Sequence, residues 1–242
     1  VTGILFGLLS SFFISEMWGK YTSIRKMSGE FKGSLLMLID SVGILSGNED
    51  FKDDFEDKME KYLIAYHVVP WHKVEEEQEY FQDFIDTVEK IEVNNDKDLN
   101  TYLKILTTIN QLRRTRNKMI NSGKSRLLKM EWTVILTLTG IFIVSLFALR
   151  DGSFLLNLLS TVLPSIALLI ILFLNDLNKV KWNEEYISYE PGEAGLEALG
   201  KKRFYDSKLL ERKDLNVPEG ADYRTEKDLE GELLDVYEEF TD

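Results

Sequence analysis

The chain of 242 residues contains no cysteine, only two histidines and only four prolines. Without cysteine it has no disulfide framework, no thiolate metal ligand and no cysteine nucleophile. The two imidazoles, His67 and His72, make a poor metal site, and histidines near helix ends are common in proteins. The sequence also lacks a glycine-rich phosphate loop, a nucleophile elbow and a paired metal-ligand motif. We therefore expect the protein not to be an enzyme.

Basic residues are outnumbered, with 29 Lys and Arg against 41 Asp and Glu. Most of the excess lies in residues 183–242, where 18 acidic and 8 basic residues give a net charge of −10. A segment of this sign repels nucleic acid and anionic lipid surfaces, so no nucleic acid partner is expected. Shorter acidic runs, such as Glu75–Glu77 and Glu184–Glu185, are interpreted as solvated helix faces.

Apolar residues make up 44% of the chain and are concentrated in three stretches. Residues 132–149 and 154–174 contain no charged residue, and each is long enough to span a hydrocarbon core of about 30 Å. Between them, Arg150–Ser153 is a short polar turn, which predicts a transmembrane hairpin. Residues 3–18 are apolar apart from serines and Glu16, and they would span most of the same core.

These stretches divide the chain into four parts. We predict a transmembrane helix at residues 1–20, a helical domain at 21–130, a transmembrane hairpin at 131–178 and an acidic tail at 179–242. Because Val1 lies directly within an apolar run, a further helix is expected upstream of it.

Positive charge flanks the predicted spans on one side of the membrane. Since Lys and Arg are retained in the cytoplasm, the helical domain and the tail are predicted to be cytoplasmic in a multi-pass protein of the cell membrane. The polar turn, which holds only Arg150, is then outside. The flanking residues are Lys20, Arg25, Lys26, Lys118, Lys124, Arg126, Lys129, Lys179 and Lys181.

Residues 21–130 are predicted to be helical nearly throughout. Apolar side chains recur at spacings of three and four from Phe51 to Tyr66, from Tyr80 to Ile91 and from Leu99 to Leu112, each with a charged opposite face. The aromatic residues among them are interpreted as the core of a helical bundle rather than as a ligand site. Breaks are expected at Gly47–Asn48 and Asn94–Asp96.

The tail carries fewer signals than the preceding domain. Pro191–Gly192 and Pro218–Gly220 predict turns, and residues 229–237 form a short amphipathic stretch. No run of alternating strand residues occurs, so the fold class is all-α. The stretch Arg113–Arg116 allows two interpretations: it binds lipid headgroups, or it forms salt bridges with acidic helices.

The first apolar stretch carries a pattern that suits a pore. Ile4, Leu8, Ser11 and Ser15 follow one another at spacings of four, three and four, and therefore share one face of a helix. Rings of apolar side chains gate channels by dewetting, and hydroxyl groups solvate a passing ion. Close packing of helices through small residues explains the same pattern, so both readings stay open on periodicity alone.

Several short motifs, in the same order along the chain, carry a resemblance to the bestrophins, and most closely to the bestrophin-like membrane proteins of prokaryotes. The segment with Gly7, Trp18 and Tyr21 is similar to the pore-lining second helix of that family. The other motifs are Pro70–Trp71, Leu112–Arg116, Trp132 at the start of the hairpin, and Asn175–Asp176 after it.

The resemblance implies a helical transmembrane protein with a cytoplasmic helical bundle, assembled as a ring of five. It implies a pore neck lined by Ile4 and Leu8, with Phe12 close by. By their position along the same helix, Ser11, Ser15 and Glu16 then line the pore toward the cytoplasm. Aromatic residues near the ends of spans are typical membrane-interface anchors. These are Trp18, Tyr21 and Trp132.

Two features depart from the animal members of that family. Their dense acidic calcium-binding cluster is represented here only by Asp176, Glu184 and Glu185, so we expect no cofactor and treat calcium binding as doubtful. The neck residues are largely aliphatic rather than aromatic, and Glu16 would favour cations if it faced the lumen.

The resulting hypothesis is a homo-oligomeric, pentameric ion channel whose partners are copies of itself, membrane lipids and permeant ions. Anions such as chloride are slightly favoured over monovalent cations. The main alternative is a membrane-anchored interaction or sensory protein that presents its helical domain to a partner. A membrane enzyme is a distant third, because paired acids or histidines are lacking inside the spans.

Overall fold

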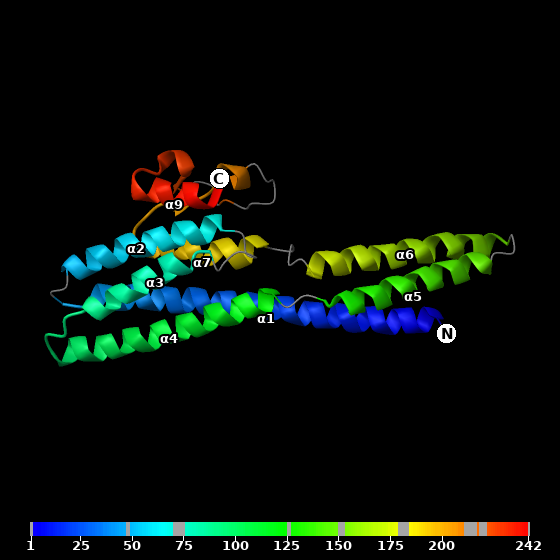
Figure 1. Ribbon diagram of the computed structural model, residues 1–242, viewed down its shortest axis with the longest axis horizontal. Helices are drawn as coiled ribbons and strands as arrows, with labels where there is room; N and C mark the ends of the chain where they lie inside the picture. Colours follow the sequence, from blue (N-terminus) through cyan, green and yellow to red (C-terminus); the bar gives the residue numbers. More distant parts are fainter. Residues whose placement is uncertain are drawn as a thin grey trace. The chain divides into compact units, whose positions relative to one another are not determined.

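The computed structural model describes residues 2–46, 49–69, 76–124, 127–149, 153–178, 184–210, 217 and 222–241. These residues are almost wholly helical (Figure 1), which confirms the all-α prediction. The chain forms two compact units. We call them the apolar unit, residues 1–23 and 125–183, and the charged unit, residues 24–124 and 184–242.

Helix α1 begins at Thr2 and ends at Ile44, well beyond the apolar stretch with which it starts. Its second half contains no proline, and its buried side chains recur at helical spacing, so the helix continues. The predicted boundary near residue 20 therefore falls inside a helix. The buried side chains of this second half include Ile24, Met27, Phe31, Leu35, Leu38 and Val42.

The apolar unit is built from the start of α1 and the two predicted hairpin helices. Helix α5 spans Lys129–Ala148 and helix α6 spans Phe154–Asn178, and the turn at Arg150–Gly152 lies outside the described residues. Within the described part of the chain, α1, α5 and α6 are the three helices long and apolar enough to cross a membrane. Their shared core includes Phe6, Phe13, Met17, Ile135, Ala167 and Leu174.

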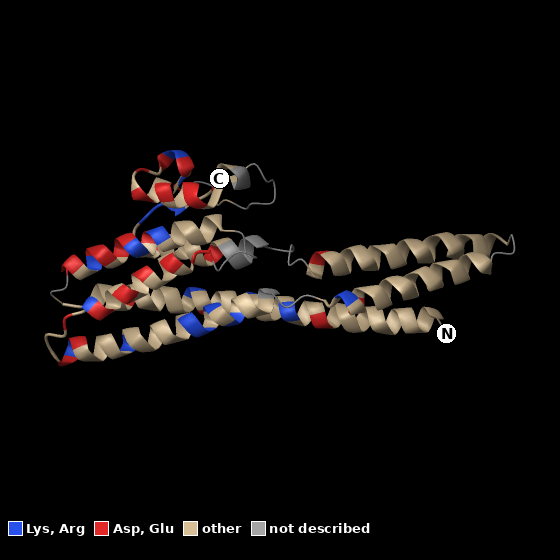
Figure 2. Cartoon of the chain, viewed as in Figure 1, with Lys and Arg blue, Asp and Glu red and all other residues tan. Residues whose placement is uncertain are grey.

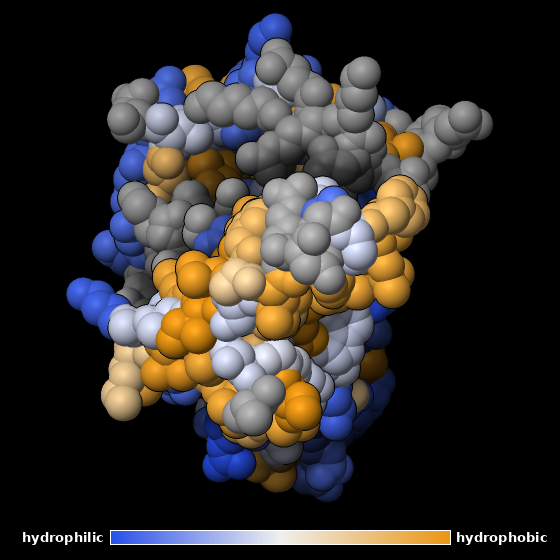
Figure 3. Space-filling view, turned by 90° about the vertical axis from the view of Figure 1, so that its right-hand side faces the viewer, coloured by the Kyte–Doolittle hydropathy of each residue, from blue (hydrophilic) through white to orange (hydrophobic). Residues whose placement is uncertain are grey.

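The outer surface of the apolar unit is hydrophobic. Val144 and Leu169, for example, are 67% and 64% exposed. Hydrophobic residues cover much of the face seen in Figure 3. Figure 2 shows that α5 and α6 carry almost no charged residues, whereas Lys, Arg, Asp and Glu crowd the helices of the charged unit. Such a surface is stable against lipid rather than water.

The charged unit contains the helices that the periodicity predicts. Helix α2 spans Glu49–Val68, α3 spans Gln78–Asp86 and continues into the short 3-10 helix η2 at Thr87–Lys90, and α4 spans Asp96–Lys124. The predicted aromatic core is confirmed, because the side chains of Phe55, Tyr62, Phe81 and Phe84 are almost fully buried.

The predicted break at Asn94–Asp96 is confirmed, since the chain has no regular structure from Ile91 to Asn94. Asn95 then caps α4, because its Oδ1 accepts a hydrogen bond of 2.8 Å from the backbone N–H of Asp98. The other predicted break, at Gly47–Asn48, lies outside the described residues.

The predicted apolar face of α4 is wrong at its first turns. Leu99 and Leu103 are 44% and 53% exposed, and the buried face is instead formed by Ile105, Ile109 and Leu112. At the start of the helix a polar residue takes the inner position. Asp98 is buried and its Oδ1 accepts a hydrogen bond of 3.3 Å from the backbone N–H of Ser46.

The predicted turn at Pro191–Gly192 is also wrong, because both residues lie inside helix α7, Glu184–Ala198. Tertiary packing overrides the local preference of proline and glycine. A Cβ atom at Gly195 would lie only 2.9 Å from the side chains of Leu35 and Leu63, so the glycine lets α7 approach α1 and α2 closely. The predicted turn at Pro218–Gly220 lies outside the described residues.

After α7 the chain forms two very short strands and a terminal helix. Strands β1, Arg203–Phe204, and β2, Tyr223–Arg224, pair in parallel, and α8, Ser207–Leu210, lies between them in sequence. The 3-10 helix η3, Glu226–Asp228, comes just before the predicted amphipathic stretch, and most of that stretch lies in helix α9, Glu232–Thr241. Both α7 and α9 contact α2, so the acidic tail from Glu184 onward is part of the charged unit.

Candidate functional site

One face of α1 in the apolar unit is left uncovered by the rest of that unit. Ile4, Leu8 and Phe12 are 69%, 65% and 61% exposed, and Ser11 and Ser15 are exposed as well. The opposite face is buried against the core of the unit through Phe6, Phe13 and Met17. The structure thus brings the predicted neck and lining residues together on one continuous surface, which we call the α1 face.

The α1 face is not used for close helix packing within this unit. The tight approach lies elsewhere, at Gly3, where an added Cβ atom would come within 2.9 Å of Phe142 on α5. Phe6 stacks on the same Phe142 ring at a centroid distance of 5.4 Å. Ser11 and Ser15 take no part in these contacts, so packing within the chain does not explain the hydroxyl groups on this face.

Glu16 lies beside the α1 face and is half-buried rather than exposed. Its carboxylate forms an ion pair of 2.8 Å with the ammonium group of Lys20, one helical turn later. The pair has no net charge. Glu16 therefore does not act as an isolated negative charge at this end of the α1 face.

The three aromatic residues predicted as interface anchors are placed differently. Trp18 is 46% exposed and its ring lies 5.6 Å from that of Tyr21, which is buried. Trp132 packs against the core of the apolar unit while remaining partly exposed. Only the two tryptophans thus present part of a ring to the surroundings, and their anchoring role stays a prediction.

The prediction of a cation site involves Asp176, Glu184 and Glu185. Asp176 is half-buried in the apolar unit, whereas the side chains of Glu184 and Glu185 lie outside the described residues. Among the residues that the structure describes, no group of three or more His, Cys, Asp or Glu side chains is arranged to hold a metal ion.

A buried ion pair in the charged unit joins Arg116 to a residue that the sequence-based interpretation had placed in solvent. Glu77, predicted to be part of a solvated acidic run, is fully buried, and its Oε1 lies 3.3 Å from Nε of Arg116. The guanidinium group of Arg116 also donates to Gln78 and lies 4.5 Å from the ring centre of Phe81. For Arg116, the structure thus supports a salt bridge rather than a contact with lipid.

Two effects act in opposite directions on the pKa of the buried Glu77 carboxyl. Burial raises the pKa of the Glu77 carboxyl to about 8, although the neighbouring Arg116 acts in the opposite direction. Burial also raises the pKa of Tyr62 and Tyr66 well above their usual value, so both phenols stay neutral. The pair joins the start of α3 to α4.

The family is shown by a comparison with protein-family models, in which the Bestrophin-like domain matches residues 1–179. The chain belongs to the bestrophin-like family. No curated protein and no solved structure matches the chain significantly. The match includes α1 to α6, so it covers the α1 face and the Glu77–Arg116 pair, and it identifies this bestrophin-like chain as a membrane protein.

The segment after residue 179 lies outside the family match. In this bestrophin-like protein, ion pairs connect it to α2. Buried Glu60 of α2 forms an ion pair of 3.2 Å with Lys201 and a second ion pair with Arg224 of β2. Lys61 binds Glu232 at the start of α9. The C-terminal segment is therefore held by charges as well as by apolar packing.

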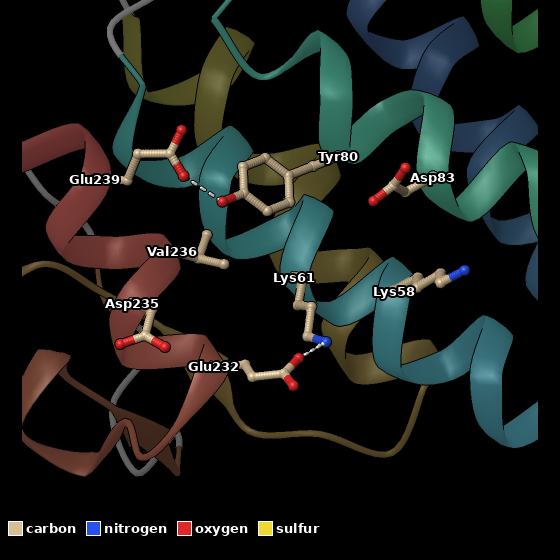
Figure 4. Close-up of a pocket in the computed structure, with 8 residues that line it drawn as sticks. All are labelled: Lys58, Lys61, Tyr80, Asp83, Glu232, Asp235, Val236 and Glu239. Carbon is tan, nitrogen blue, oxygen red and sulfur yellow. Dashed lines mark hydrogen bonds and ion pairs between the residues drawn. The ribbon is translucent and has the colours of Figure 1, made fainter.

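A pocket of about 310 Å³ lies where α9 meets α2 and α3. Figure 4 shows Lys58 and Lys61 projecting from α2, with Glu232, Asp235 and Glu239 on α9. Lys61 pairs with Glu232, and the hydroxyl of Tyr80 donates to Glu239. These contacts cross the pocket from one helix to another, so the pocket forms the joint between the family domain and the C-terminal helix.

His67, near the end of α2, is buried under the same segment. Its ring stacks on Tyr189 at 5.6 Å and meets Phe204 edge-on at 6.1 Å, and neither ring nitrogen has a hydrogen-bond partner among the described residues. A Cβ atom at Gly192 would lie 2.5 Å from Nε2, so only glycine fits there. Burial, with a contribution from Arg224, lowers the pKa of His67 to about 3.

Acid is therefore expected to loosen this segment through His67. Because its folded pKa of about 3 lies below the ordinary value of 6.5, its contribution to stability is complete above pH 6.5 and is lost as the pH falls toward 3. At pH 5 the loss is about 2 kcal/mol. Thermal melting of the His67→Leu variant, which cannot titrate, should show a smaller decline from pH 7 to pH 5 than the wild type, and parallel declines would contradict the assignment.

Proposed function

We propose that this bestrophin-like protein is an ion channel whose pore is lined by the α1 face. The observation that carries the proposal is the character of that face, which is uncovered and changes from apolar at Ile4 and Leu8 to hydroxyl-bearing at Ser11 and Ser15. Facing lipid, such hydroxyls gain nothing. Facing a narrow pore, the apolar part is suited to a constriction and the hydroxyls to solvation of an ion.

A single α1 helix from each chain encloses a pore only if several chains form a ring. We propose a ring of five, on the strength of membership in the bestrophin-like family. The charged unit offers apolar side chains that a neighbouring copy would cover, including the exposed Leu99 and Leu103 of α4. These two residues are accordingly assigned to contacts between subunits.

The proposed channel lies in the cell membrane as a multi-pass protein, with the charged unit in the cytoplasm. The support is the concentration of Lys and Arg beside the spans on that side. The proposed activity is passive conduction of small ions, without a catalysed reaction. At the cytoplasmic end of the α1 face Glu16 is balanced by Lys20, so neither chloride nor a monovalent cation is favoured there by an isolated charge.

Stoichiometry tests the proposal most directly. Native mass spectrometry of the full-length protein in detergent micelles is expected to give a mass of five copies. Liposomes that contain this species should then release a salt gradient faster than empty liposomes. A monomer or a dimer would contradict the channel and favour a membrane-anchored interaction or sensory protein, which needs no ring.

A further inference from the structure

Every charged side chain of α1 has an interaction partner, with one exception among the described residues. In the charged unit, Lys26 lies 3.9 Å from Glu30, and Lys32 forms an ion pair of 2.8 Å with Glu190 of α7. Glu16 and Lys20 are paired in the apolar unit, and Arg25 also has a partner. Within the described part of the chain, Asp40 is the charged side chain of α1 that has neither an ion pair nor a hydrogen bond.

Asp40 is exposed and lies on the outer face of this part of α1. Gly29, Gly33, Met37 and Ile44 are exposed at helical spacing along the same surface, and Cβ atoms added at the two glycines would meet nothing within 4 Å. The opposite face is buried through Leu35, Leu38 and Val42. The carboxylate of Asp40 therefore projects away from the core of the charged unit.

The unpaired carboxylate of Asp40 indicates whether this face of α1 lies in water or in a dry contact between subunits. Removing such a group from water without a partner is strongly unfavourable, so a dry contact between subunits is a poor place for it. The surface of α4 that was assigned to contacts between subunits is apolar at Leu99 and Leu103, so burying these side chains does not desolvate a charge. The face of α1 with Asp40 is thus the one expected to remain in water.

We propose that Asp40 is a specificity-determining residue that gives the channel a preference for monovalent cations over chloride. This inference rests on the proposed function, since it requires α1 of each subunit to line the conduction path. In a ring of subunits, one Asp40 from each chain forms a ring of carboxylates in the aqueous part of that path. Such rings concentrate cations and repel anions.

The size of the effect follows from the potential that the ring produces. Clusters of like charge reach surface potentials of one to several kT. A potential of one kT changes the ratio of cations to anions by about sevenfold, because the two signs respond in opposite directions. The preference should weaken as salt is raised, since the Debye length is about 8 Å at physiological ionic strength and about 3 Å at 1 M.

The test is the reversal potential of the reconstituted full-length protein in planar bilayers across a KCl gradient. Wild type is expected to reverse toward the potassium potential. Asp40→Asn, which keeps the shape of the side chain, should lower the potassium-to-chloride permeability ratio by about sevenfold. The matched control is Asp53→Asn on α2, which removes another exposed, unpartnered carboxylate of the charged unit and should leave the ratio unchanged.

The outcomes separate this inference from the proposed function. A conducting wild type whose ratio is the same in Asp40→Asn and Asp53→Asn would overturn the role of Asp40 and leave the channel intact. Equal shifts in both variants would point to general surface charge and would also overturn the role of Asp40. A wild-type pentamer that conducts no ion would overturn the proposed function itself. Native mass spectrometry of each variant shows whether the ring has assembled.

Discussion

Alanine in place of Leu8 is expected to raise ion flux through protein-containing liposomes by about tenfold, which corresponds to a barrier lower by about 1.4 kcal/mol. Leu8 is 65% exposed on the α1 face, one helical turn after Ile4. If the two residues form an apolar constriction, a smaller side chain widens it and makes it easier for water and ions to enter. The substitution removes no buried contact, so the protein should fold and assemble normally.

The matched control for this experiment is Leu169→Ala on α6. Leu169 is 64% exposed on another helix of the apolar unit, so the change removes the same atoms from a surface of the same exposure. Its flux should equal that of the wild type. If Leu8→Ala forms an intact oligomer with wild-type flux, or if both variants leak equally, Leu8 does not form the constriction.

At pH 9, above the pKa of Glu77 of about 8, leucine in place of Glu77 is expected to lower the free energy of unfolding by about 3–5 kcal/mol. Glu77 is fully buried against Arg116, which is only 3% exposed. Arginine does not lose its proton in proteins, so the variant leaves a buried positive charge without its carboxylate partner. The measurement is the thermal melting temperature of the purified protein, followed by tryptophan fluorescence.

The double variant Glu77→Leu/Arg116→Met distinguishes a buried ion pair from simple loss of packing. Because it removes both charges and keeps apolar volume, it should recover most of the stability that Glu77→Leu loses. Glu79→Leu, on the exposed side of α3, should change stability by less than about 0.5 kcal/mol. A double variant that melts no higher than Glu77→Leu would show that the pair has no special electrostatic role.

Most of the architecture was predictable because it depends on local patterns. The spans at α5 and α6 follow from uncharged runs, since a bilayer core tolerates few charges in a helix. Helix α2 follows from the spacing of Phe55, Met59 and Tyr62, because a helix that buries one face must repeat its apolar residues every three or four positions. Short elements were not predictable, since β1 and β2 contain only two residues each.

Two of the failed predictions share a physical cause. Glu77 was assigned to solvent and Leu99 to the core, whereas the structure buries Glu77 and exposes Leu99. A proline and a glycine were assigned to a turn, yet Pro191 and Gly192 lie within α7. For Glu77 and Gly192 the decisive partner is distant in sequence, namely Arg116, 39 residues away, and His67.

For the candidate site, the sequence by itself determined the apolar spans, the helical spacing of Ile4, Leu8, Ser11 and Ser15 and the resemblance to the bestrophins, because these depend on residues that are neighbours along the chain. Only the tertiary structure decided which side of α1 is uncovered and that Glu16 is balanced by Lys20. It also decided that Asp40, among the described charged residues of α1, has no ion-pair or hydrogen-bond partner. Burial and charge balance depend on which helices pack around a residue, and helical periodicity defines a face without saying what lies against it.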